Sequence, residues 1–196
     1  MVMPLNVDEA VQRLLEGNQR YTGGRSIHPN QGTDRREEVQ RGQTPFAVIL
    51  GCSDSRVPPE IIFDQGVGDL FVIRVAGNIV DDAVLGSIEY AAEHLGVGLV
   101  VVLGHQRCGA VQAAVKGGEA RGHVAALIEA ISPAVYEART LPGDVVDNAI
   151  RASVRRSVSL LRTSRPLLGD LVRGGKLEVI GAYYRLEGGT VEIVGE

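Results

Sequence analysis

Two short segments of the chain contain side chains that can bind a metal ion. The first holds Cys52, Asp54 and Arg56, and the second holds His105 and Cys108. Two thiolates and one imidazole form a ligand set that zinc accepts, and the close spacing of His105 and Cys108 lets one turn of chain present both to one ion. Three protein ligands leave a fourth position open, which is typical of catalytic zinc. The sequence therefore predicts one Zn2+ per chain, bound by Cys52, His105 and Cys108.

Asp54 has two possible roles at such a site. In an extended segment alternate residues point the same way, so Cys52, Asp54 and Arg56 are expected to share one side of the chain. Asp54 could close the metal site as a fourth ligand. It could instead pair with Arg56, whose planar guanidinium suits a carboxylate, and leave the fourth position to water. The first arrangement blocks chemistry and the second permits it.

Each of these residues also has an ordinary structural interpretation. A buried cysteine is usually a small apolar core residue, and a lone histidine or an Asp–Arg pair is commonly structural. Their conjunction favours a metal site, because unrelated core residues have no reason to gather at the ends of two strands. A phosphatase-type loop is a weaker alternative, because it places its arginine further from the nucleophile than the four positions between Cys52 and Arg56. With two cysteines in the chain, a disulfide framework is excluded.

Four short apolar runs must position these segments. Each run is continuous rather than alternating, which is typical of strands buried on both faces of a parallel sheet. They occupy residues 46–50, 70–73, 99–103 and 177–180. The first and third end in glycine directly before the two segments, so neighbouring strands would bring the three ligands to the carboxyl edge of the sheet, where α/β folds bind ligands. A turn signal at 186–190 predicts a terminal hairpin of residues 183–185 and 191–194.

Amphipathic helices are predicted before and between these runs, from apolar residues that recur every three or four positions. They cover residues 7–15, 84–95 and about 144–163, with Asn6 or Asp8 as the expected cap of the first helix. The predicted fold class is α/β, with a mainly parallel central sheet flanked by helices and a C-terminal antiparallel hairpin or edge strand. The length of 196 residues favours one domain, 1–196. We divide it into an N-terminal helical arm at about 1–44, with a short helix near 35–41, and an α/β core at about 45–196.

Composition and charge exclude several classes of protein. Hydrophobic residues make up 44% and charged residues 22% of the chain, close to globular averages. The net charge of −4 lacks the basic excess of a nucleic-acid-binding protein, so no nucleic-acid partner is expected. No apolar run approaches the roughly 20 residues that cross a membrane, and the acidic N-terminus does not resemble a signal peptide. We therefore expect a cytoplasmic protein without a membrane partner.

Taken together, the two segments resemble the paired motifs of the β-class carbonic anhydrases. The resemblance covers nearly the whole chain, from residues 16–21 through 61–66, 69–71 and 86–90 to the terminal strands. It implies that Cys52, His105 and Cys108 hold the zinc. It also implies that Asp54 and Arg56 form the catalytic dyad beside it.

The resemblance further implies a substrate pocket and a partner subunit. Gln43, Phe71 and Tyr90 would line this pocket across a dimer interface, with Gly109 as a further substrate-binding residue. Phe71 and Tyr90 could equally be aromatic residues of the core. Because the family assembles as dimers or larger even-numbered oligomers, we expect a homodimer or a higher homo-oligomer of this chain.

The activity that the resemblance implies is the reversible hydration of carbon dioxide to bicarbonate and a proton, by a carbonate dehydratase, which is a lyase. Zinc lowers the pKa of bound water from about 15.7 to about 7, so zinc-bound hydroxide can attack CO2 at neutral pH. Two alternatives use the same residues. One is hydrolysis of the CO2 analogues carbon disulfide or carbonyl sulfide, and the other is a zinc-binding homologue without catalysis.

Overall fold

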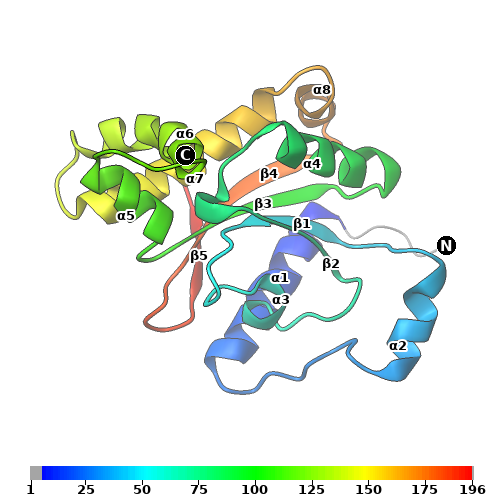
Figure 1. Cartoon of the computed structure of the whole chain (residues 1–196). Helices are drawn as coiled ribbons and strands as arrows, with labels where there is room; N and C mark the ends of the chain where they lie inside the picture. The colour runs from blue at the N-terminus through cyan, green and yellow to red at the C-terminus, as the bar shows by residue number, and fades with distance from the viewer. Residues whose placement is uncertain (1–5, 196) are drawn as a thin grey trace.

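A five-stranded sheet forms the centre of the molecule (Figure 1). The computed structural model describes residues 6–195, so residues 1–5 of the predicted arm and Glu196 lie outside the described residues. The strands are β1 Ala47–Gly51, β2 Leu70–Arg74, β3 Leu99–His105, β4 Glu178–Tyr184 and β5 Val191–Val194. They lie in the order β2-β1-β3-β4-β5, in which β1 to β4 pair in parallel and β5 pairs antiparallel with β4. The predicted α/β fold with an antiparallel edge strand is confirmed.

Alternate residues of the strands fill two separate cores, one on each face of the sheet. Val48 and Leu50 of β1 pack into one core together with Val100 of β3. Ile49 of β1 and Val101 of β3 pack into the other. Because every residue of β1 and β3 is buried, both strands appear in the sequence as continuous apolar runs.

Helices cover both faces of the sheet (Figure 1). Those that pack on one face are α4 Asp82–His94, α7 Val145–Thr163 and α8 Leu168–Arg173. Those on the other face are α1 Val7–Thr22 and α3 Pro59–Ile62. The remaining helices are α2 Thr33–Glu38, η1 Val39–Arg41, η2 Ala76–Asn78, α5 Gly109–Lys116 and α6 Val124–Ala138. Within residues 6–195, no helix is long and apolar enough to cross a bilayer.

The observed elements correct the sequence interpretation at β4 and add several helices. Residues 177–180 and 183–185 are not separate strands, because β4 runs without a break through Gly181. A Cβ at Gly181 would lie 2.7 Å from Cγ1 of Val154, so this glycine gives α7 room above the strand. The sequence analysis predicted no bounds for helices α3, α5, α6 and α8. Much of α6 is apolar and it contains Pro133, which conceals a helical period.

A buried carboxylate attaches the segment after α1 to the core. Asp64 accepts hydrogen bonds from Arg20 Nε at 2.6 Å and from the backbone N–H groups of Ile27 and His28 at 3.1 and 3.0 Å. Its side chain is fully buried. Burial by itself raises the pKa of Asp64, but the three donors outweigh burial and hold the pKa below its usual value. The ionised carboxylate therefore stabilises the attachment of residues 27 and 28 to the core.

Candidate metal centre

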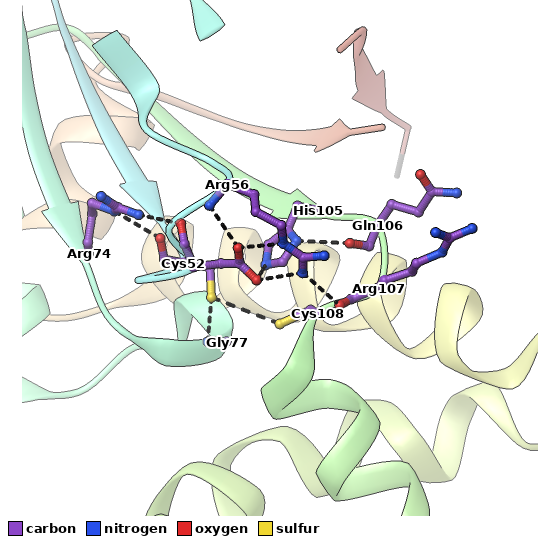
Figure 2. Close-up of polar contacts among 9 residues, drawn as sticks. Cys52, Arg56, Arg74, Gly77, His105, Gln106, Arg107 and Cys108 are labelled. Atoms are coloured by element: carbon purple, nitrogen blue, oxygen red, sulfur yellow. Dashed lines mark hydrogen bonds and ion pairs between the residues drawn. The ribbon is translucent and has the colours of Figure 1, made fainter. Parts of the chain in front are cut away.

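The ends of two neighbouring parallel strands form the candidate site. β1 and β3 pair directly, with Gly51 opposite Leu103, and the sheet continues from them in opposite directions. Cys52 follows β1, His105 ends β3 and Cys108 caps α5. Such a switch in strand order is where open α/β sheets bind ligands. The structure thus brings together the three residues that the sequence singled out as zinc ligands (Figure 2).

The geometry of these three side chains fits a tetrahedral metal ion. Their ligand atoms all lie within 4.8 Å of one another, and all three residues are buried. The two sulfurs are 4.0 Å apart, close to the roughly 3.8 Å expected for two sulfurs on one tetrahedral zinc ion. Nε2 of His105 is buried without a hydrogen-bond partner. Because buried polar atoms are normally paired, this nitrogen is well suited to a metal.

Hydrogen bonds prepare the imidazole and one thiol to act as ligands. Nδ1 of His105 lies 3.0 Å from the carbonyl oxygen of Gln106, which accepts, so Nδ1 carries the proton and Nε2 keeps a lone pair. Hydrogen bonding with Cys108 lowers the pKa of the Cys52 thiol, as does the N–H of Gly77, which donates to Cys52 Sγ at 3.2 Å. The same thiol contact raises the pKa of Cys108. A dication would displace the proton that the two sulfurs share.

Asp54 pairs with Arg56 and does not join the cluster. Arg56 donates from Nε to Oδ1 at 2.9 Å and from Nη2 to Oδ2 at 2.7 Å, and its backbone N–H donates to Oδ1 at 2.9 Å. These bonds hold the pKa of Asp54 well below its usual range, so the carboxylate is ionised at neutral pH. Oδ2 nevertheless lies 3.9 Å from Nε2 of His105. The pairing of Asp54 with Arg56 is one of the two arrangements that the sequence left open, and whether Asp54 also binds a metal stays a prediction.

Two contacts at this site come from residues that the sequence did not single out. Arg74, at the end of β2, donates to the carbonyl oxygens of Cys52 and Asp54 at 2.9 and 2.6 Å (Figure 2). Gly77 follows in η2 and supplies the N–H group at the Cys52 sulfur. In the sequence, Arg74 is a charged residue directly after an apolar run. That position does not indicate which carbonyl oxygens its side chain binds.

The expected pocket residues do not all converge within one chain. Phe71 of β2 and Tyr90 of α4 lie side by side, with ring centroids 6.3 Å apart, and Tyr90 is 47% exposed. Gly109 begins α5 beside the ligand cluster, and a Cβ there would meet nothing within 4 Å. Gln43 is exposed and precedes β1, whereas Cys52 follows this strand, which is about 13 Å long. Gln43 therefore lies at the wrong end of β1 to reach the metal ligands of its own chain.

The fold and the cluster define an α/β protein with a buried Cys-His-Cys site at the carboxyl edge of a parallel sheet. A model of the family described as carbonic anhydrase matches residues 47–191. The chain is 45% identical over 184 residues to carbonic anhydrase 2 of Mycobacterium tuberculosis. This alignment covers 92% of the chain and 89% of that protein. The chain is 40% identical over 188 residues to the carbonic anhydrase of Mycolicibacterium smegmatis, with coverage of 94% and 91%.

Solved structures of β-carbonic anhydrases are also similar to this chain. One of two tetrameric β-carbonic anhydrases from Sordaria macrospora matches with a TM-score of 0.76 and 25% identity, covering 96% of this chain and 98% of that chain. A Coccomyxa β-carbonic anhydrase in complex with acetazolamide matches with a TM-score of 0.76 and 27% identity, covering 94% and 86%. The chain belongs to the β-carbonic anhydrase family, whose activity is that of a carbonate dehydratase, a lyase.

Proposed function

We propose that this chain catalyses the reversible hydration of carbon dioxide to bicarbonate and a proton, with one zinc ion per chain. The observation that carries the proposal is the buried cluster of Cys52, His105 and Cys108, beside an Asp54 that is turned toward Arg56. Three protein ligands keep one coordination position for solvent, as catalytic zinc sites do. The relatives from Mycobacterium tuberculosis and Mycolicibacterium smegmatis are named for the same activity.

Zinc suits this donor set because thiolate and imidazole ligands are those it prefers. When bound, zinc supplies a Lewis acid that lowers the pKa of a coordinated water to about 7. Cys52 and Cys108 would bind as thiolates, and His105 would bind through Nε2. The carbonyl of Gln106 fixes the His105 tautomer and orients the ring toward the ion.

Asp54 is the residue that we assign to orienting the reacting water. Its carboxylate is ionised and lies close to the ligand cluster, so it can accept a hydrogen bond from that water. Arg56 positions the carboxylate with a bidentate pair. The same pair keeps Asp54 from competing for the metal, so the two residues act as one unit.

The substrate pocket in this proposal is mainly apolar. CO2 carries no charge, so it needs an apolar surface and a donor for the oxygens that gain charge during the reaction. We assign the surface to Phe71 and Tyr90, the open space above Gly109 to the substrate, and the donor role to Gln43. Because Gln43 lies at the far end of β1 in its own chain, a second copy must supply it. The tetrameric relative from Sordaria macrospora supports a homo-oligomer.

Stopped-flow assays with a pH indicator test this proposal. The zinc-loaded chain should accelerate CO2 hydration, and parallel assays with carbon disulfide and carbonyl sulfide test the alternative substrates. A folded, zinc-loaded chain that hydrates no CO2 would contradict the proposal. Turnover of a sulfur analogue by that chain would favour the hydrolase, and no turnover at all would favour the non-catalytic homologue. The cytoplasmic location and the absence of a nucleic-acid partner stay predictions.

A further inference from the structure

The guanidinium of Arg74 binds the backbone of the segment that carries both Cys52 and Asp54, and Figure 2 shows it beside Cys52. Nε donates to the carbonyl oxygen of Cys52 at 2.9 Å, and Nη2 donates to the carbonyl oxygen of Asp54 at 2.6 Å. Two donors on one rigid plane therefore hold two carbonyls of the same short segment. Both of these hydrogen bonds end on backbone oxygens, which is consistent with a role in shaping the segment.

The chain around Arg74 reinforces this hold. Gly51 lies opposite Arg74 in the pairing of β1 with β2, and the N–H of Val75 donates to the carbonyl of Gly51 at 3.1 Å. The N–H of Gly77 donates to the sulfur of Cys52 at 3.2 Å. Residues 51–54 are thus held at successive points by the end of β2 and by η2. Because the Arg74 contacts come from a side chain, a substitution can remove them and leave the backbone contacts in place.

The ion pair with Arg56 holds the Asp54 carboxylate, whereas the Arg74 contacts hold the backbone that carries it. Oδ2 of Asp54 lies 3.9 Å from Nε2 of His105, so a small shift of the segment would bring the carboxylate to the metal. Restraint of the backbone at residues 52 and 54 opposes that shift.

We propose that Arg74 is a positioning residue of this site, which holds the carbonyls of Cys52 and Asp54 so that the Asp54 carboxylate faces Arg56 and stays off the metal. The inference rests on the proposed function, because its consequence is a change in metal coordination. Lysine cannot fully replace this arginine, because an ammonium group is a point charge without a planar pair of donors. The effect of Arg74 should therefore appear as competition for the fourth coordination position.

Cobalt(II) in place of zinc allows this competition to be measured without turnover, because its visible absorption changes when an anion binds. Thiocyanate is titrated into the cobalt-loaded wild-type chain, into Arg74→Met, and into Arg74→Met combined with Asp54→Asn. Arg74→Lys is the second single variant, which keeps the charge should Arg74→Met fail to fold. Arg139→Met is the matched control, because Arg139 is exposed and donates to the carbonyl of Val115, near the end of α5 remote from the cluster, at 3.2 Å.

We expect thiocyanate to bind Arg74→Met about tenfold more weakly than the wild-type chain, because Asp54 then competes for the cobalt. Arg74→Lys should also bind more weakly, Asp54→Asn should restore the affinity, and Arg139→Met should match the wild-type chain. Unchanged affinity in the folded Arg74 variants, or a weakening that Asp54→Asn does not relieve, would overturn the positioning role. A wild-type chain that takes up no cobalt would instead contradict the metal centre, and with it the proposed function.

Discussion

Asp54 lies within reach of two partners that would give the site opposite properties. Paired with Arg56, it leaves the fourth coordination position to solvent, whereas bound to the metal it would close that position. The ligand cluster could be predicted from the sequence, because two thiols and an imidazole follow glycine-terminated apolar runs. The sequence left two roles for Asp54 open, because the side chain that holds its backbone, Arg74, lies on another strand.

Arg56→Ala should lower kcat for CO2 hydration by about 10- to 100-fold. The substitution removes the guanidinium that holds Asp54, so the carboxylate becomes free to occupy the metal. Steady-state kinetics of the zinc-loaded variant would measure the change. Arg185→Ala is the control, because Arg185 pairs with Glu192 in the terminal hairpin and not with the dyad. If Arg56→Ala turned over CO2 at the wild-type rate, Arg56 would have no role in keeping the site open.

Secondary-structure elements were predictable where burial gives them a simple pattern. β1 and β3 are buried along their whole length, and α7 carries a clear apolar stripe. The pattern did not predict β4 as one strand, because a glycine such as Gly181 is typical of a strand end. In the structure this glycine makes room for α7. The pattern also did not give the bounds of α6, which has apolar residues on several sides. In both places the residue types reflect packing against other elements. The local period of apolar residues therefore does not indicate the element.

Gly17→Ala should destabilise the fold by about 1–3 kcal/mol, although alanine is the better helix former by about 1 kcal/mol. A Cβ at Gly17 of α1 would lie 1.8 Å from the carbonyl oxygen of Phe63, and this backbone atom cannot move aside. Urea unfolding measures the difference. Gly86→Ala in α4 is the matched control, because a Cβ there meets nothing within 4 Å, and it should stabilise by about 0.5–1 kcal/mol. A stabilising Gly17→Ala would contradict the close packing of α1.

Asp64→Asn should lower the free energy of unfolding by about 2 kcal/mol at pH 7, because Arg20 loses a buried charged partner. The pKa of Asp64 is depressed in the folded chain, so its contribution is fully present above the usual value of 3.8 and is lost as the pH falls through the folded value. The difference between the variant and the wild-type chain should therefore shrink in acid. Unfolding curves at pH 7 and below pH 4 check this, with the exposed Asp34→Asn as the control. A difference that stayed constant with pH would contradict the role of the charge.

At the scale of the whole molecule, one chain does not complete the proposed site. Gln43 lies before β1, and the metal ligands lie after it. Phe71 belongs to β2, which is an edge strand of the sheet, and Tyr90 is half exposed beside it. The sequence pointed to these residues through resemblance alone, because in the proposed site they converge only with a second chain. The division of the chain into an arm and a core also stays a prediction.

Subunit mixing tests the shared site. Gln43→Ala and Cys52→Ser should each be nearly inactive, because one loses the pocket donor and the other loses a metal ligand. In a mixed dimer, one site would combine an intact cluster from one chain with Gln43 from its partner. Random mixing by unfolding and refolding should then restore about a quarter of the wild-type activity. A mixture no more active than its components would show that Gln43 does not act across an interface.

The metal content of the purified, folded chain tests the central claim most directly. Elemental analysis should find one zinc ion per chain in the wild-type protein. Cys108→Ser should retain the fold, as judged by circular dichroism, and lose most of the zinc. A wild-type chain that is folded, contains no metal and takes up none when zinc is supplied would contradict the account.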